Sequence, residues 1–214
     1  MNVDRLRSNL DAVRARIAEA CRRSKRDPSG VTLIVVTKSV PAPIIPRLGE
    51  LGVEDIGENR PVEAVSRVGS LQGFRRHMIG HLQTNKLQKA LSWADTIHSV
   101  DRPSLVRALE ESNKKVPIFV QVNVSGETSK GGYAPEDAEA AVAQARRSLE
   151  VRGLMTMAPE GADARPHFRR LRELAARIGV PQLSMGMSQD YEVGVEEGAT
   201  HVRIGTAIFE GVQL

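Results

Sequence analysis

The feature that most constrains the fold is a regular alternation of short apolar runs with helix-like stretches along the chain. The clearest run, residues 31–36, is a continuous β-branched and aliphatic series, which is typical of a strand buried on both faces. Alternating strands and helices predict a parallel sheet, and eight such units favour a closed barrel over an open sheet. The predicted strands are 31–37, 53–57, 77–80, 96–100, 116–124, 151–157, 181–187 and 201–208.

The segment before the first strand is predicted to be an additional helix, because its apolar residues recur at spacings of three and four. Those residues are Val3, Leu6, Leu10, Val13 and Ile17, and turn-forming residues at 27–30 end the helix. No linker-like shift in composition interrupts the pattern, so we expect one α/β domain over residues 1–214, a (β/α)8 TIM-type barrel. The other predicted helices are 41–51, 60–70, 83–93, 102–114, 135–148, 164–178 and 189–197.

Composition excludes several classes of function. The net charge of +4 is spread over short basic runs with only 3% aromatic residues, which favours a solvated surface over a nucleic-acid interface. Cys21 is the only cysteine, so neither an intrachain disulfide nor a cysteine-based zinc site is expected. His77 and His81 are four apart on a predicted strand, without helical metal-ligand geometry, and we expect no metal. No apolar run approaches the roughly 20 residues of a membrane span, and we expect a cytoplasmic protein.

Polar residues collect just after the predicted strands, where barrels of this kind place their sites. Lys38 follows the first strand, and partial desolvation there would favour the neutral amine that forms a Schiff base. The alternative is a lysine that extends from the strand end into solvent. The other residues at these ends are Glu58, Asn59, His81, Ser99, Asn123, Met155, Ser188, Gly205 and Thr206.

The last two strands carry candidates for binding a phosphate and a ring. Ser188 falls where the seventh strand gives way to a helix, so it is either a phosphate ligand or simply the cap of that helix. Gly205 permits close backbone approach, and Thr206 adds a hydroxyl. Arg203 shares a strand face with Gly205, and its charge needs an acceptor, either a ligand or a neighbouring carboxylate. Together with a lysine nucleophile, these groups fit pyridoxal 5'-phosphate (PLP).

The sequence resembles the YggS/PROSC family of PLP homeostasis proteins, whose fold is that of the alanine racemase N-terminal domain. The resemblance extends from the first predicted strand to the last. Small departures are Thr37 in place of the usual serine, Ile56 in place of phenylalanine, and residues 76–78. The matching segments are VVTK (35–38), IGEN (56–59), IGHLQTNK (79–86), IHSVD (97–101), QVNVS (121–125) with Glu127 and SKGG (129–132), RGLM (152–155), LSMGMS (183–188) and VRIGTAIF (202–209).

The resemblance implies a role for each matching site residue. Lys38 would form the Schiff base with PLP, and Arg203 would face the pyridine nitrogen. The phosphate would be held by Ser188, Gly205 and Thr206. The ring or the open face of the site would be flanked by Asn59 and His81.

An arginine at the pyridine nitrogen disfavours its protonation and weakens the ring as an electron sink. Alanine racemase compensates with a tyrosine from a second domain, and here no such domain follows the last predicted strand. We therefore expect a monomeric, non-catalytic protein that buffers PLP or delivers it to PLP-dependent apoenzymes. Two alternatives remain: a small PLP-dependent amino-acid racemase that uses Lys38 as its only base, and an interaction protein that has lost the cofactor.

Overall fold

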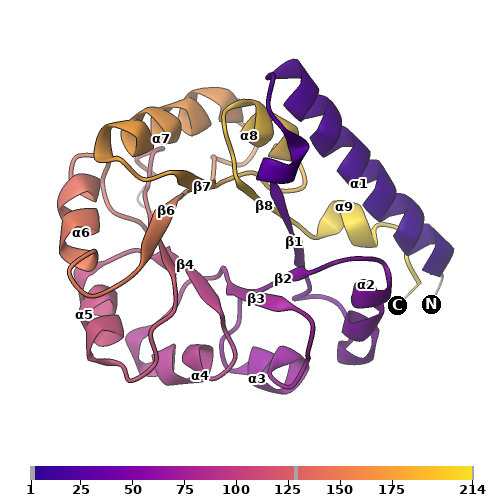
Figure 1. The fold of residues 1–214 in the computed structure, drawn as a ribbon, viewed down its shortest axis with the longest axis horizontal. Helices are drawn as coiled ribbons and strands as arrows, with labels where there is room; N and C mark the ends of the chain where they lie inside the picture. The colour runs from indigo at the N-terminus through magenta and orange to yellow at the C-terminus, as the bar shows by residue number, and fades with distance from the viewer. Residues whose placement is uncertain (1–2, 128–129, 214) are drawn as a thin grey trace.

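The strands form a closed parallel barrel in chain order (Figure 1). A computed structural model describes residues 3–127 and 130–213. The barrel closes because β1 (Thr32–Val36) pairs with β2 (Asp55–Glu58) on one side and with β8 (His201–Ile204) on the other. The TIM-type fold class is thus confirmed. The strands between them are β3 (Arg75–Met78), β4 (Thr96–Val100), β5 (Ile118–Gln121), β6 (Val151–Met155) and β7 (Gln182–Ser184).

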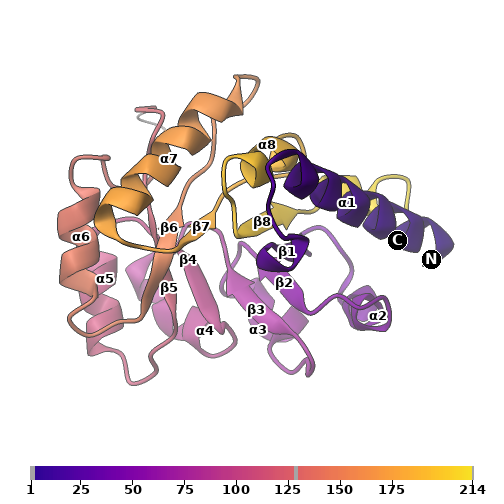
Figure 2. The same cartoon turned by 45° about the horizontal axis from the view of Figure 1, so that its top comes forward.

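Helices surround the barrel, and their apolar faces pack on the outward side chains of the strands (Figures 1 and 2). The long N-terminal helix α1 (Val3–Arg23) is present as predicted, and the described members of its apolar stripe are buried except Val3. The others are α2 (Ile45–Glu50), α3 (Glu63–Val68), α4 (Leu87–Leu91), α5 (Pro103–Glu111), α6 (Ala138–Ala145), α7 (Ala164–Ile178), α8 (Tyr191–Glu196) and α9 (Thr206–Phe209), with short 3-10 turns at Pro28–Gly30, Ala42–Ile44 and Thr84–Lys86. In the described part of the chain, no helix is long and apolar enough to cross a membrane.

Helix α1 lies beside α8 and α9, so the N-terminal segment covers the end of the barrel's last unit (Figure 2). The Asn9 side-chain amide donates to the carbonyls of Ile208 and Glu210, at 2.9 Å each. Arg14 similarly donates to the carbonyls of Leu51 and Gly52. The helix therefore braces both α9 and the loop before β2.

The strand side chains alternate between the helices and the barrel interior, as the period of two requires. Val35, Ile56, Ile97 and Val202 belong to the outer apolar cluster. Their neighbours in sequence point inward, where several are polar. His98 of β4, for example, contacts Ser184 of β7 across the barrel at 2.8 Å.

Six of the predicted strands are longer than the observed ones, and the last two show why. The strand predicted at 201–208 ends at Ile204, and residues 206–209 form α9 instead. A Cβ at Gly205 would lie 3.1 Å from the Val36 carbonyl oxygen, so the chain turns into the helix at a residue without a side chain. The strand predicted at 181–187 ends at Ser184, because Gly186 takes a left-handed conformation with φ of 97°.

Candidate functional site

Six of the seven predicted site residues lie at the carboxyl ends of the strands, at one mouth of the barrel. Parallel strands bring these ends together although they are far apart in sequence. The seventh, Arg203, lies on β8 itself and is buried. The others are Lys38 after β1, Asn59 after β2, His81 after β3, Ser188 after β7, and Gly205 and Thr206 after β8.

Lys38 occupies a turn that begins once β1 has ended, and its side chain is exposed. The expectation of partial desolvation at this position is therefore wrong. The buried residues of the turn are Thr37 and Val40, on either side of the exposed pair 38–39. The turn holds its amine toward solvent at the barrel mouth, accessible to an incoming aldehyde.

A buried ion pair supports the Lys38 turn from below. The Thr37 hydroxyl donates to Glu58 Oε1 at 2.7 Å, and Glu58 is only 2% exposed. Arg67 of α3 approaches the same carboxylate at 3.3 Å and donates to the carbonyls of Thr37 and Val40 at 2.7 and 2.5 Å. The sequence placed Glu58 at the end of a strand, without a supporting role, and gave no signal for Arg67.

Replacing Arg67 with alanine is expected to loosen the turn that carries Lys38. The variant leaves two carbonyls without their donor and Glu58 without its cation, a loss of about 1–3 kcal/mol. Hydrogen exchange should show the Val40 amide, which bonds Thr37 O, losing protection by about tenfold or more. Arg60→Ala is the matched control, because Arg60 pairs with Glu63 on the surface. Equal protection of Val40 in both variants would contradict the supporting role of Arg67.

The loop after β7 meets the start of α9. The Ala207 amide donates to Ser188 Oγ at a long 3.4 Å. The alternative that Ser188 simply caps the next helix is wrong: α8 begins at Tyr191, with Asp190 at the N-cap position. Asp190 Oδ1 accepts from the Met187 amide at 2.6 Å and closes the intervening turn. Ser188 is therefore free of a capping role and directs its hydroxyl toward α9.

This meeting of loops fits a phosphate group. The Ser188 hydroxyl lies beside the Ala207 amide in the first turn of α9, and Thr206, which begins that helix, adds a second hydroxyl. The Ile208 and Phe209 amides already donate to the Gly205 carbonyl, whereas the Ala207 amide has no acceptor within the helix. A side chain at Gly205 would crowd the Val36 carbonyl oxygen, which would lie 3.1 Å from its Cβ. The carboxylate of Glu192, a possible source of repulsion, instead pairs with Arg16 and Arg23 on α1, at 3.8 and 3.1 Å.

Arg203 lies deeper, inside the barrel and beneath this mouth. Its Nη1 donates to Ser184 Oγ at 2.5 Å and its Nη2 to the Thr156 carbonyl at 2.9 Å. In the described part of the chain it forms no ion pair with a carboxylate, so the salt-bridge alternative is wrong. Burial lowers the pKa of Arg203 to about 10, and the guanidinium remains charged at neutral pH. Three of its five N–H groups are left to bind a ligand.

Asn59 and His81 complete the rim. Asn59 Oδ1 is buried and, among the described residues, has no hydrogen-bond partner, so a ligand donor would satisfy it. His81 Nδ1 lies 2.9 Å from Asp101 Oδ2, and its side chain is 62% exposed. Nearby, burial and the charge of Asp101 raise the pKa of Tyr133 to about 12. Ser129, part of a matching motif, lies outside the described residues.

Three features of the structure come together here: a closed parallel barrel, a lysine at the mouth after β1, and a meeting of the loop after β7 with the start of α9 that carries hydroxyl and amide groups. The family model of the alanine racemase N-terminal domain matches residues 1–212. A Pseudomonas aeruginosa protein named pyridoxal phosphate homeostasis protein is 40% identical over 214 residues, covering 94% of this chain and 93% of its own. An Aquifex aeolicus protein of the same name is 37% identical over 217 residues, covering 94% and 95%.

Solved structures agree. PipY of Synechococcus elongatus without PLP superposes with a TM-score of 0.83 at 32% identity, covering 95% of this chain and 99% of its own. The PLP-bound form of PipY gives 0.77 at 34%, covering 90% and 99%. Alanine racemase from Corynebacterium glutamicum, at 18% identity and a TM-score of 0.68, shares the fold. The chain belongs to the alanine racemase N-terminal domain family and, within it, to the pyridoxal phosphate homeostasis proteins.

Proposed function

We propose that this protein binds PLP at the carboxyl-terminal mouth of its barrel, as a Schiff base on Lys38, and serves in PLP homeostasis. The observation that carries the proposal is the juxtaposition of an accessible lysine, an anion-binding corner and a buried arginine at one mouth. The names of the relatives and the PLP bound in PipY support it. The Lys38 amine would condense with the aldehyde of PLP and release water.

PLP supplies an electron-withdrawing ring conjugated to the attached amine. Lys38 would anchor the aldehyde carbon, while Ser188, Thr206 and the backbone at Gly205 would hold the phosphate. Arg203 would present its remaining N–H groups to the pyridine nitrogen and keep that nitrogen unprotonated. Asn59 and His81 would flank the ring.

Substitution of Ser188 or Thr206 tests the phosphate corner. Each of Ser188→Ala and Thr206→Val removes a hydroxyl donor to a dianion, so affinity for PLP should fall about tenfold. Affinity for pyridoxal, which lacks the phosphate, should stay the same. Titration of the visible absorbance with both compounds measures the ratio, and a parallel loss for pyridoxal would contradict this assignment.

We propose further that the protein holds and delivers PLP and does not turn over a substrate. An unprotonated ring stabilises a carbanion poorly, and Tyr133, with its pKa raised to about 12, is almost entirely protonated at neutral pH and so is not available as a base. The test is to mix the loaded protein with a PLP-dependent apoenzyme and follow both the visible band and the recovered activity. Transfer supports delivery, and a cofactor that never leaves contradicts it.

A racemase-like enzyme is the second candidate, favoured by the His81–Asp101 pair at the mouth. A carboxylate that orients an imidazole is a common acid–base arrangement. Proton exchange at Cα, scanned across amino acids in heavy water, distinguishes the candidates. Exchange that disappears in both Lys38→Ala and His81→Gln would establish an enzyme, and its absence for every amino acid would support the carrier.

We also propose that residues 1–214 act as one barrel domain and as a cytoplasmic monomer. Cys21, the only cysteine, is buried and so cannot form a cross-link between intact copies. Light scattering coupled to size-exclusion chromatography, with and without PLP, tests the monomer. A mass of twice 23.3 kDa would contradict it.

A further inference from the structure

An unbroken chain of hydrogen bonds runs through the barrel interior from its amino-terminal mouth to Arg203. Asp55 Oδ1 lies 2.9 Å from His77 Nε2, and His77 Nδ1 lies 2.9 Å from His98 Nε2. His98 Nδ1 lies 2.8 Å from Ser184 Oγ, which is 2.5 Å from Arg203 Nη1. None of the five residues is more than 5% exposed. The chain links β2, β3, β4, β7 and β8.

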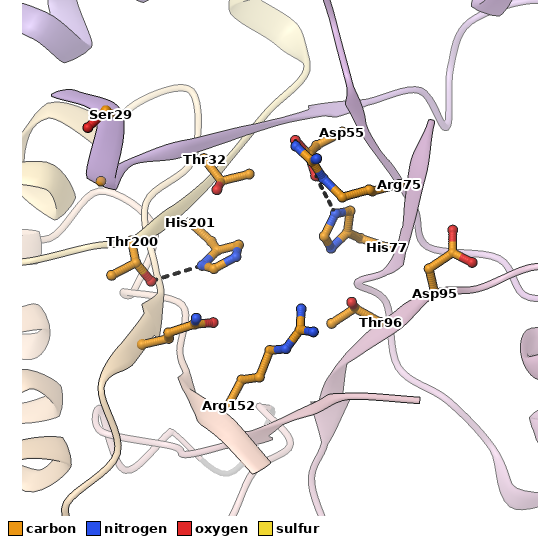
Figure 3. Close-up of a pocket in the computed structure, with 12 residues that line it drawn as sticks. Ser29, Thr32, Asp55, Arg75, His77, Asp95, Thr96, Arg152, Thr200 and His201 are labelled. Atoms are coloured by element: carbon orange, nitrogen blue, oxygen red, sulfur yellow. Dashed lines mark hydrogen bonds and ion pairs between the residues drawn. The ribbon is translucent and has the colours of Figure 1, made fainter. Parts of the chain in front are cut away.

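The end of this hydrogen-bonded chain at the amino-terminal mouth of the barrel is open to solvent. A cavity of about 450 Å³ opens there, lined by the first residues of several strands. Figure 3 shows Asp55, Arg75 and His77 on one side of it, with His201 and Arg152 facing them. Arg75 binds Asp55 through two bonds of 2.7 Å each. Asp55 is thus a carboxylate fixed between a guanidinium and an imidazole.

The charge of Asp55 sets the direction of every bond in the chain. Although burial raises its pKa, the bonds from His77 and Arg75 lower the pKa of Asp55 to about 2 overall, so it accepts. His77 must then donate from Nε2 and accept at Nδ1. His98 donates to it from Nε2 and accepts the Ser184 hydroxyl proton at Nδ1. The Ser184 oxygen in turn accepts from Arg203. Each imidazole nitrogen then makes one hydrogen bond, one nitrogen of each ring as donor and the other as acceptor, with both imidazoles neutral.

The electrostatics of His98 agree with this order. Burial lowers the pKa of His98 well below its ordinary value, and the nearby charge of Arg203 lowers it further. A proton added at Nδ1 would turn that atom into a donor and leave the Ser184 hydroxyl without an acceptor. The neutral form is therefore the one that satisfies the whole chain.

We propose that Asp55, His77, His98 and Ser184 are positioning residues that fix the guanidinium of Arg203 toward the cofactor ring through this one-way hydrogen-bonded chain. The inference rests on the proposed binding of PLP beside Arg203. Asp55, which lies at the opposite mouth and six strands before Arg203 in chain order, would then affect the cofactor's spectrum.

His201 provides a matched control within the same interior. It is also a buried histidine, with its ring 5.8 Å from that of His98 and in edge contact with Phe119. Its only side-chain hydrogen bond among the described residues goes to its neighbour Thr200. His201→Gln disturbs the packing much as His98→Gln does, but it leaves the chain intact.

The first test begins with the protein without PLP, and this first step is independent of the proposed function. Long-range nitrogen-15 NMR of the imidazoles should show His77 and His98 both protonated at Nε2 alone between pH 6 and 8. Adding PLP should then shift the His98 nitrogens while those of His201 stay unchanged. An Nδ1-protonated ring at either position would overturn the inference. Nitrogen-15 signals of His98 that do not shift when PLP binds would overturn it as well.

The second test uses variants loaded with PLP, with borohydride trapping on Lys38 as a separate readout. Ser184→Ala and His98→Gln should shift the pH midpoint of the visible band by about half a unit or more. Ser184→Thr, which keeps the hydroxyl, should restore the original midpoint, and His201→Gln should leave it there. If PLP is trapped on Lys38 but neither Ser184→Ala nor His98→Gln shifts the midpoint, the role of the hydrogen-bonded chain is overturned and PLP binding stands. If no PLP is trapped in the unsubstituted protein, PLP binding itself is overturned.

Discussion

Lys38→Ala is expected to abolish the visible absorbance that PLP gives on binding and all cofactor trapped by borohydride. The Schiff base requires a primary amine, and alanine offers none. The exposed position of Lys38 predicts that the fold is unaffected, because the buried contacts of this turn belong to Thr37 and Val40. The variant should therefore match the unsubstituted protein in thermal stability.

Lys86→Ala is the control for this prediction. Lys86 is another exposed lysine, in the 3-10 turn that follows β3 at the same end of the barrel. The Lys86→Ala variant should load PLP and trap it like the unsubstituted protein.

The phosphate corner should still hold PLP weakly in Lys38→Ala, so saturation at high concentration without a visible shift is also expected.

Acidification below pH 6.5 is expected to destabilise the protein steeply because of two buried histidines. Burial lowers the pKa of His201 to about 3 and that of His98 well below its ordinary value. Both rings stay neutral in the folded protein, whereas in the unfolded chain they take up protons near pH 6.5. The unfolded state then binds more protons, so stability falls as pH falls through this window.

Each such histidine contributes a slope of about 1.4 kcal/mol per pH unit once the unfolded chain is protonated. Together they should cost nearly 3 kcal/mol per unit between about pH 6 and pH 4. Below that window Asp55 adds to the loss, because the stability it contributes above its unfolded pKa of 3.8 disappears as pH falls toward 2. Burial raises the pKa of Asp190, so its contribution to stability increases as pH falls and partly offsets the loss at low pH.

Urea unfolding at pH 7, 6 and 5 measures this slope. His201→Gln should reduce it by about half, since one of the two histidines is gone. Thr96→Val changes a buried residue of the same cavity without removing a titrating group, so it should shift the free energy of unfolding at each pH but leave the slope unchanged. An unchanged slope in His201→Gln would contradict this account.

Much of the fold could be predicted because the outward residues of each strand carry a simple signal. The apolar runs and the helical stripe of α1 report burial directly. The ends of strands were less predictable. Residues 206–209 are apolar and β-branched enough to extend a strand, but the close approach of Gly205 to Val36 turns them into a helix.

The site residues could be found from sequence because most of them follow strands. The residues that hold them in place could not. Arg67 donates from α3 to the backbone of the Lys38 turn, and no sequence pattern among the neighbouring residues of that helix predicts this contact. The histidines 77, 98 and 201 lie on different strands and contact one another only after the barrel closes. Lys38 itself was correctly placed at the mouth but is exposed, because it lies in the turn after β1 and not on the strand.

The central claim is that Lys38 carries the cofactor, and peptide mapping after borohydride reduction of the PLP-loaded protein tests it most directly. The account predicts one modified peptide, containing residues 35–38, with the pyridoxyl mass on Lys38. A label on another lysine, such as Lys86 or Lys130, or no label at all, would contradict it.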